Sequence, residues 1–337
     1  IVSRDRISIL TCPTSVQRQN ETVQRRTKDT MRGFSPRLVL SKELHPLFAG
    51  QIDGVRANSV FQKAIRMHAD ASRSVPGSNL DPYYAKHMGD AGNLLIEAVA
   101  YYHHLLKENQ NFGVGATLGK LQKTAFVHGF ASPRRVTIYV KRLVQIGRLG
   151  YSEDARDRRV RRLIPGPELC ATAFRNTRDL MRAAAILWPG DGYAGRIDKD
   201  QRFFETLYTA MIHRYSAGAD PLRPFSDIRH FTSKDAGSYL LAALIYGCLQ
   251  NASKLDPRTE FTLNYSDAAA ASGVSRTHVR NVIESAEGLG LVTKMGEGGR
   301  SVQLTDKMIE SYERYFACIM ILARAAAQDA QEALGDG

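Results

Sequence analysis

The sequence predicts a mainly α-helical chain with small β-hairpins, an α+β fold class. Apolar residues recur at i, i+3, i+4 and i+7 through most of the chain, as on one face of a helix. Short alternating runs bounded by glycine follow two of these helical segments and are typical of hairpins. The second half of the chain also repeats the first at an offset of 143 to 145 residues. A length of 337 residues therefore predicts two domains of one kind.

Composition and charge narrow the function classes. Hydrophobic residues make up 43% and charged residues 24%, which excludes a disordered or fibrous chain. Lys and Arg number 46 against 34 acids, a net charge of +12, which indicates either a polyanionic partner such as nucleic acid or a basic surface of no specific use. No stretch approaches the ~18 apolar residues of a membrane span, and charges at Arg4, Asp5 and Arg6 interrupt the opening segment. We expect a cytoplasmic protein without a membrane partner.

Four cysteines, Cys12, Cys170, Cys248 and Cys318, lie far apart without a CxxC pair. This spacing predicts reduced thiols, no zinc site and no disulfide framework. The sequence also lacks GxxxxGK[ST], GxSxG and HExxH. We therefore expect no catalytic residues, no metal, no cofactor and no enzymatic activity.

Proline, glycine and charge divide the chain. Residues 1–77 are expected to form a basic, partly irregular N-terminal arm, in which residues 58–72 form one helix. That helix turns Phe61 and Ile65, with Val60 and Met67, toward a core. The segment Trp188–Gly195, with one proline and three glycines, separates domain 1 (78–190) from domain 2 (196–333).

Domain 1 opens with a long buried helix, predicted over residues 83–109 from apolar residues at helical spacing. Six of its residues reappear 145 positions later: Asp90, Ala91, Gly92, Leu95, Ala98 and Tyr101 match Asp235, Ala236, Gly237, Leu240, Ala243 and Tyr246. Further on, residues 129–149 align with residues 272–292 without a gap. Both copies predict the same order of long helix, short helix, capped helix, hairpin and long helix. A second long helix of domain 2 is predicted from residue 306 to residue 327.

The capped helix of copy one is well specified. Ser132 suits the N-cap and Pro133 the first helical position. The predicted inner face is Val136, Tyr139, Val140 and Leu143. Its outer face is expected to be mostly cationic: Arg134, Arg135, Thr137, Ile138, Lys141 and Arg142.

Copy two repeats this pattern. Its capped helix starts at Ser275 and is expected to bury Val279, Val282, Ile283 and Ala286. A short helix and a glycine-containing turn precede each capped helix, and a hairpin follows each. This order predicts tandem winged helix-turn-helix domains, with long helices of the kind that form dimer interfaces.

The basic excess is local. Residues 118–163 hold 12 Lys and Arg against 3 acids, or +9, whereas the matching residues 263–304 hold 4 of each. Residues 1–77 carry +7, and the remainder carries −4. We therefore expect copy one to make most of the phosphate contacts. The candidate DNA-contacting residues of copy one are Ser132, Arg134, Arg135, Thr137, Lys141, Arg156, Arg158, Arg159 and Arg161. Those of copy two are Arg276, Thr277, His278, Arg280, Asn281 and Arg300.

Residues 132–166, with the Gly-x-Leu phrase at 147–149 and Asp157-Arg158-Arg159, resemble the multiple antibiotic resistance regulator (MarR) family of bacterial transcription factors. The resemblance implies a recognition helix in the major groove and a wing on the DNA backbone or minor groove. It implies that Arg134, Arg135, Thr137 and Lys141 face the groove and that residues 157–159 form the wing tip.

Members are typically homodimers of one such domain, so a chain with two copies would mimic a dimer, and a further homodimer stays open. The resemblance also implies a small aromatic effector, bound near Tyr101, Tyr102, His103, Tyr239 and Tyr246. The alternative is that these aromatic residues, at helical spacing, only pack in the core.

The main hypothesis is a sequence-specific, double-stranded DNA-binding transcriptional regulator that reads two unlike half-sites. Arg135 is expected to read a base, and Arg158 to contact phosphate. A plasmid-type replication initiator also resembles a tandem winged-helix chain, and binding to direct repeats would identify it. Winged helices that serve as protein-interaction modules are the third alternative.

Overall fold

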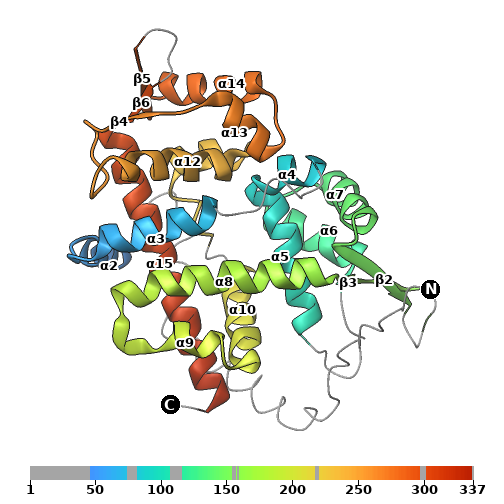
Figure 1. Cartoon of the computed structure of the whole chain (residues 1–337). Coiled ribbons are helices and arrows are strands. Elements are labelled where there is room, and N and C mark those ends of the chain that lie inside the picture. Colours follow the sequence, from blue (N-terminus) through green and yellow to red (C-terminus); the bar gives the residue numbers. More distant parts are fainter. Residues whose placement is uncertain are drawn as a thin grey trace, which may run out of the picture.

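The structure is a computed structural model that describes residues 46–73, 82–106, 116–153, 157, 159–216, 220–296 and 301–335. Most of these residues are helical, and the strands form two small antiparallel sheets (Figure 1). The predicted α+β class is therefore confirmed. Residues 1–45, most of the expected linker at 74–81, Cys12, Arg156, Arg158 and Arg300 lie outside the described residues.

The two halves run through the same elements in the same order. The first half consists of α3 (Phe61–Arg73), α4 (Pro82–Met88), α5 (Ala91–Leu105), β1 (Ala116–Thr117), α6 (Leu118–Val127), α7 (Pro133–Gln145), β2 (Leu149–Glu153), β3 (Arg161–Pro165) and α8 (Pro167–Leu187). The second half consists of α10 (Gln201–Ser216), α11 (Ser226–Thr232), α12 (Gly237–Gln250), β4 (Glu260–Thr262), α13 (Tyr265–Ser272), α14 (Arg276–Gly288), β5 (Val292–Met295), β6 (Ser301–Leu304) and α15 (Asp306–Leu334). Helix α2 (Pro46–Arg56) precedes them, and η3 (Pro189–Asp191) and α9 (Tyr193–Ile197) lie between them.

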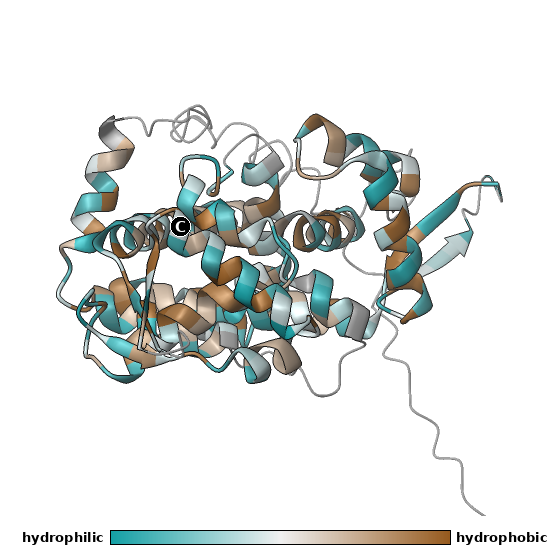
Figure 2. Ribbon diagram, turned by 90° about the horizontal axis from the view of Figure 1, so that it is seen from above, coloured by the Kyte–Doolittle hydropathy of each residue, from teal (hydrophilic) through white to brown (hydrophobic). Residues whose placement is uncertain are grey.

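The sheets share one topology. The strand order is β1-β3-β2 in the first half and β4-β6-β5 in the second, and every pair is antiparallel. Leu163 on β3 and Val302 on β6 are fully buried at their centres. The hairpin β2–β3 extends from the body of the molecule and is mostly hydrophilic (Figure 2).

The first helix of each half packs against both halves. Helix α3 packs against α8 of its own half and against α12 of the other half. Reciprocally, α10 packs against α15 of its own half and against α5 of the other half. The bidentate ion pair between Arg214 and Asp329 ties α10 to the 29-residue helix α15. One continuous core therefore spans both halves, as in a dimer interface.

The segment expected as an N-terminal arm contributes to this core. Helix α3 covers nearly the predicted range, and Phe61 and Ile65 are buried as expected. Met67 is 38% exposed, so its assignment to the core is wrong. Arg56 on α2 donates two hydrogen bonds to Glu313 on α15, which fixes α2 to the second half.

The single helix predicted over residues 83–109 is wrong, because the structure breaks it into α4 and α5 at Gly89 and Asp90. Asp90 has extended backbone angles, and its carboxylate accepts the backbone N–H of Asn93, so it is an N-cap. Helix α5 also buries Glu97. Apolar spacing alone does not detect a polar cap or a buried carboxylate. The predicted second helix of domain 2 is confirmed and runs on from residue 327 to residue 334.

Candidate nucleic-acid interface

Helix α7 starts as the sequence predicts. The Ser132 hydroxyl accepts the backbone N–H of Arg135 at 3.2 Å, and Pro133 occupies the first turn. The four residues predicted to face inward are all buried: Val136, Tyr139, Val140 and Leu143. Arg134, Ile138 and Lys141 are exposed on the opposite side. This outer face exposes two cations and one apolar side chain.

Arg135 does not belong to that face. Its guanidinium forms an ion pair with Asp90 and donates to the Asn93 side-chain oxygen from Nε at 3.1 Å and from Nη2 at 3.0 Å. Because Asp90 is only 5% exposed, this contact holds the start of α7 against the start of α5. The Arg135 side chain is 39% exposed, so it lies toward solvent as predicted, but its guanidinium is bound to α5. The helical spacing that placed Arg135 on the outer side of α7 could not show that α5 lies beside it.

Thr137 is likewise engaged within the protein. Its hydroxyl donates to the Pro133 carbonyl at 2.9 Å and accepts from the Gln122 amide at 2.8 Å. Gln122 lies on α6 and also donates to the Pro133 carbonyl, so the two residues brace α6 against α7. Sequence reasoning missed Gln122, since a lone glutamine carries no periodic signal.

The hairpin of the first half places its arginines unequally. Arg161 is exposed and its guanidinium lies 4.1 Å from the centroid of the Tyr151 ring, across the β2–β3 pair. Arg159 is exposed near the turn, where its backbone N–H donates to Asp157. Arg162 alternates with Arg161 and is half-buried. Because successive side chains of a strand point to opposite faces, only some of the hairpin arginines point outward, as the sequence predicts.

Helix α14 of the second half has the same cap and a weaker charge. Ser275 accepts the His278 N–H at 3.0 Å, and the inner face is buried as expected. Arg276, Thr277, Arg280 and Asn281 are exposed. The His278 ring is not free, since its Nε2 lies 2.9 Å from the Asp235 carbonyl oxygen.

Acidic residues of α14 neutralise the lysine of the second hairpin. Lys294 forms an ion pair with Glu287 at 2.9 Å, and this hydrogen bond lowers the pKa of the Glu287 carboxyl. Glu284 lies 3.9 Å from both Lys294 and Arg280. The described part of this half therefore offers less unpaired positive charge than α7 and β2–β3.

A buried polar cluster supports α7 from beneath. Glu97 accepts the Tyr139 hydroxyl at 2.6 Å, the Tyr84 hydroxyl at 3.2 Å and both Nε and Nη2 of Arg148 at 3.1 and 2.8 Å. Burial, together with the charge of Glu97, raises the pKa of both tyrosines, so their hydroxyls stay protonated and donate. This cluster joins α4, α5, α7 and the start of β2.

In the second half, apolar residues occupy the equivalent positions. The repeat pairs the cluster residues Glu97, Tyr139 and Arg148 with Ala242, Val282 and Leu291. All three counterparts are buried. The two halves thus support their capped helices by different physical means.

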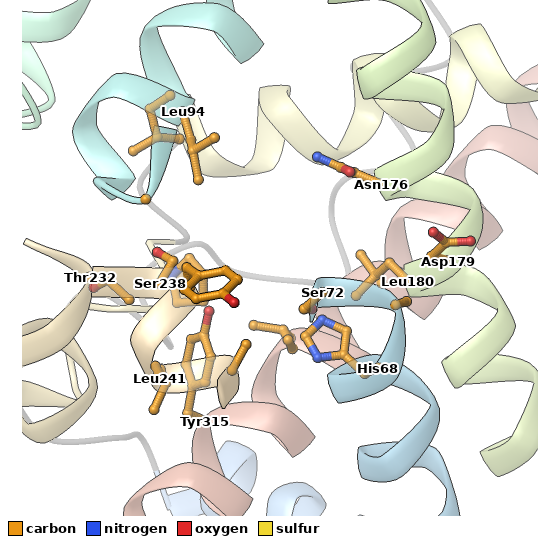
Figure 3. A pocket seen from close by; sticks show the side chains of 18 of the residues that line it. His68, Ser72, Leu94, Asn176, Asp179, Leu180, Thr232, Ser238, Leu241 and Tyr315 are labelled. Carbon is orange, nitrogen blue, oxygen red and sulfur yellow. The ribbon is translucent and has the colours of Figure 1, made fainter. Parts of the chain in front are cut away.

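A cavity of about 530 Å³ lies between the halves (Figure 3). Its wall is mainly apolar and comes from α3, α5, α8, α10, α12 and α15. Two polar side chains at this wall have buried atoms without a hydrogen-bond partner, the Thr232 hydroxyl and the His68 Nδ1. Burial lowers the pKa of His68 to about 4, so its ring is neutral near pH 7. Of the five residues expected near an effector, Tyr239 lines this cavity.

Among the described residues, no helix is long and apolar enough to cross a bilayer, and no three His, Cys, Asp or Glu side chains converge on a metal position. Cys170, Cys248 and Cys318 are free thiols, and burial raises the pKa of Cys318 to about 12. Comparison of the chain with family models, curated proteins and solved structures found no match.

Proposed function

We propose that the chain is a sequence-specific, double-stranded DNA-binding transcriptional regulator of the cytoplasm, with two winged helix-turn-helix units resembling a fused MarR dimer. In this proposal α7 and α14 enter successive major grooves, and the arginines of β2–β3 contact the backbone or the minor groove. The observation that carries it is the duplicated order of helix, strand, two helices and hairpin, with exposed cations on the outer face of α7.

The reciprocal contacts of α3 and α10 with the other half favour inverted half-sites. Reciprocal contacts of this kind relate the halves by an approximate two-fold axis, and a two-fold protein matches a palindrome-like site. A replication initiator would instead be identified by binding to directly repeated sites. Because α7 and α14 differ in sequence, the palindrome is expected to be imperfect.

The test is selection of bound sequences from random duplex DNA, followed by fluorescence anisotropy at several salt concentrations. We expect two unlike, inverted half-sites whose centres lie about one helical turn apart, ~34 Å. With ~6 to 8 phosphate contacts, the logarithm of affinity should fall with the logarithm of salt at a slope of about −5 to −7. Equal affinity for selected and random DNA would contradict the proposal, and direct repeats would favour the initiator.

The cavity supports the further proposal of a small aromatic effector. A ligand there would contact α5 and α8 of one half and α12 and α15 of the other. It would therefore favour one relative arrangement of the two halves. We expect aromatic compounds of phenol to biphenyl size to raise the melting temperature. Ala242→Phe should abolish that shift by filling the cavity, and Ala171→Phe, on the exposed side of α8, should retain it. A shift that survives Ala242→Phe would place the ligand elsewhere.

A further inference from the structure

A chain of hydrogen bonds connects the starts of α7 and α14. From α14, the His278 ring bonds the Asp235 carbonyl, and the Asp235 carboxylate accepts His87 Nδ1 at 2.8 Å. The His87 carbonyl then accepts the Asn93 amide at 3.0 Å, and the Asn93 oxygen accepts the Arg135 guanidinium of α7. Each end of this chain is the third residue after a serine N-cap. The two capped helices are therefore joined through α4, the start of α5 and Asp235, which precedes α12.

The backbones of the two halves meet at the same place. The Ala236 N–H donates to the Lys86 carbonyl and the Ser238 N–H to the Gly89 carbonyl, both at 2.9 Å. A Cβ added at Gly89 would lie 2.5 Å from the Ala236 Cα, so no larger residue fits without separating the halves. Ala236 has a φ of +56°, the left-handed region that alanine rarely adopts. Strained backbone of this kind persists where the surrounding structure holds it in place.

The repeat explains why Asp235 can bridge the halves. Asp90 and Asp235 are equivalent, and each anchors the third residue of its own capped helix. Asp90 does so with its carboxylate, which binds Arg135. The His278 ring instead contacts the backbone carbonyl of Asp235. The Asp235 carboxylate therefore contacts the other half, where it binds His87 and, at 3.3 Å, the Lys86 ammonium. In Figure 1, α4 lies between α7 and α13.

We infer that this junction, defined as Lys86, His87, Gly89, Asp235 and Ala236, fixes the separation of the two helices that read DNA and so selects the half-site spacing. The inference rests on the proposed function. One inserted base pair moves a half-site by ~3.4 Å and rotates it by ~35°, which a rigid pair of helices cannot follow. Asp235 and His87 are thus positioning residues, and neither needs to touch DNA.

The experiment uses the selected site and versions with one or two base pairs inserted between the half-sites, with affinities measured by anisotropy. Wild-type protein should lose at least about tenfold in affinity on the two-base-pair insertion. His87→Ala should flatten this dependence to within about threefold, because the Asp235 carboxylate loses its closer partner and keeps only Lys86, at 3.3 Å. His87→Asn should restore it, since the amide nitrogen takes the place of Nδ1. Gly89→Ala should shift the preferred spacing by forcing the halves apart.

Asp53→Asn, an exposed carboxylate on α2, is the matched control for Asp235→Asn, and circular dichroism verifies folding. Asp235→Asn should flatten the spacing dependence and Asp53→Asn should leave it unchanged. Identical spacing profiles for wild type, His87→Ala and Gly89→Ala would overturn the inference while leaving the DNA-binding proposal intact. A wild-type protein that prefers no sequence would instead overturn the proposed function on which the inference rests.

Discussion

Glu97→Ala should lower the free energy of unfolding by about 3 to 5 kcal/mol, the range for breaking one partner of a buried ion pair. Arg148 and Glu97 are each about 95% buried, so the variant leaves an uncompensated charge. It also removes the acceptor of the Tyr84 and Tyr139 hydroxyls. Urea unfolding at pH 7, followed by circular dichroism, measures the change. A loss below about 1 kcal/mol would show that water or another group replaces the carboxylate.

The second half supplies the matched control. A variant that also carries Tyr139→Val and Arg148→Leu has the residues of the second half at all three positions, and Tyr84→Phe removes the remaining hydroxyl. It should regain at least half of the lost stability, because well-packed apolar residues often replace a buried ion pair without loss. Part of the deficit should persist, since valine leaves some of the tyrosine volume empty. If the combined variant is less stable than Glu97→Ala alone, the cluster packs in a way that apolar residues cannot match.

This cluster also shows what the sequence could and could not predict. The inner faces of α7 and α14 were predicted because a buried helix face repeats with the helical period. Burial of Tyr139 was predicted from the period of its own helix, but its contact with Glu97 and Arg148 was not, because the three residues come from separate elements. The one available signal was joint change between the copies, in which all three polar residues become apolar in the second half. Contact between elements can be inferred from such joint change and not from spacing within one element.

The candidate nucleic-acid interface could also be predicted only in part. Exposure of Arg134 and Lys141 was predictable from their own helix, and the structure confirms it. The partners of Arg135 and His278 lie on or beside α5 and α12, so their position required the tertiary arrangement. Asp90 and Asp235 did stand out as a repeated pair in the sequence. Their role as anchors of the capped helices depends on packing that periodicity does not describe.

Because the Arg135 guanidinium is bound to Asp90 and Asn93, the proposed function makes Arg134 the better candidate for the base reader. Arg134→Ala should reduce discrimination between the selected site and its best single-base mismatch by about 1 to 3 kcal/mol, because a bidentate arginine contact to guanine contributes that much. Arg134 is exposed at the first turn of α7, where recognition helices approach base edges. Anisotropy on a set of single-base variants of the selected site measures the effect. Only the base pair that Arg134 reads should lose its preference.

Three matched variants separate base reading from other roles. Lys141→Ala should weaken all sequences alike and make the salt slope shallower by about 1, as loss of a phosphate contact does. Arg135→Ala should lower the stability of the protein and weaken all sequences alike, because it frees the start of α7 from Asp90 and Asn93. Arg276→Ala, at the start of α14, should affect only the other half-site. If Arg135→Ala removes one base preference while stability stays at the wild-type value, its guanidinium leaves Asp90 on binding, and the base reader is Arg135 after all.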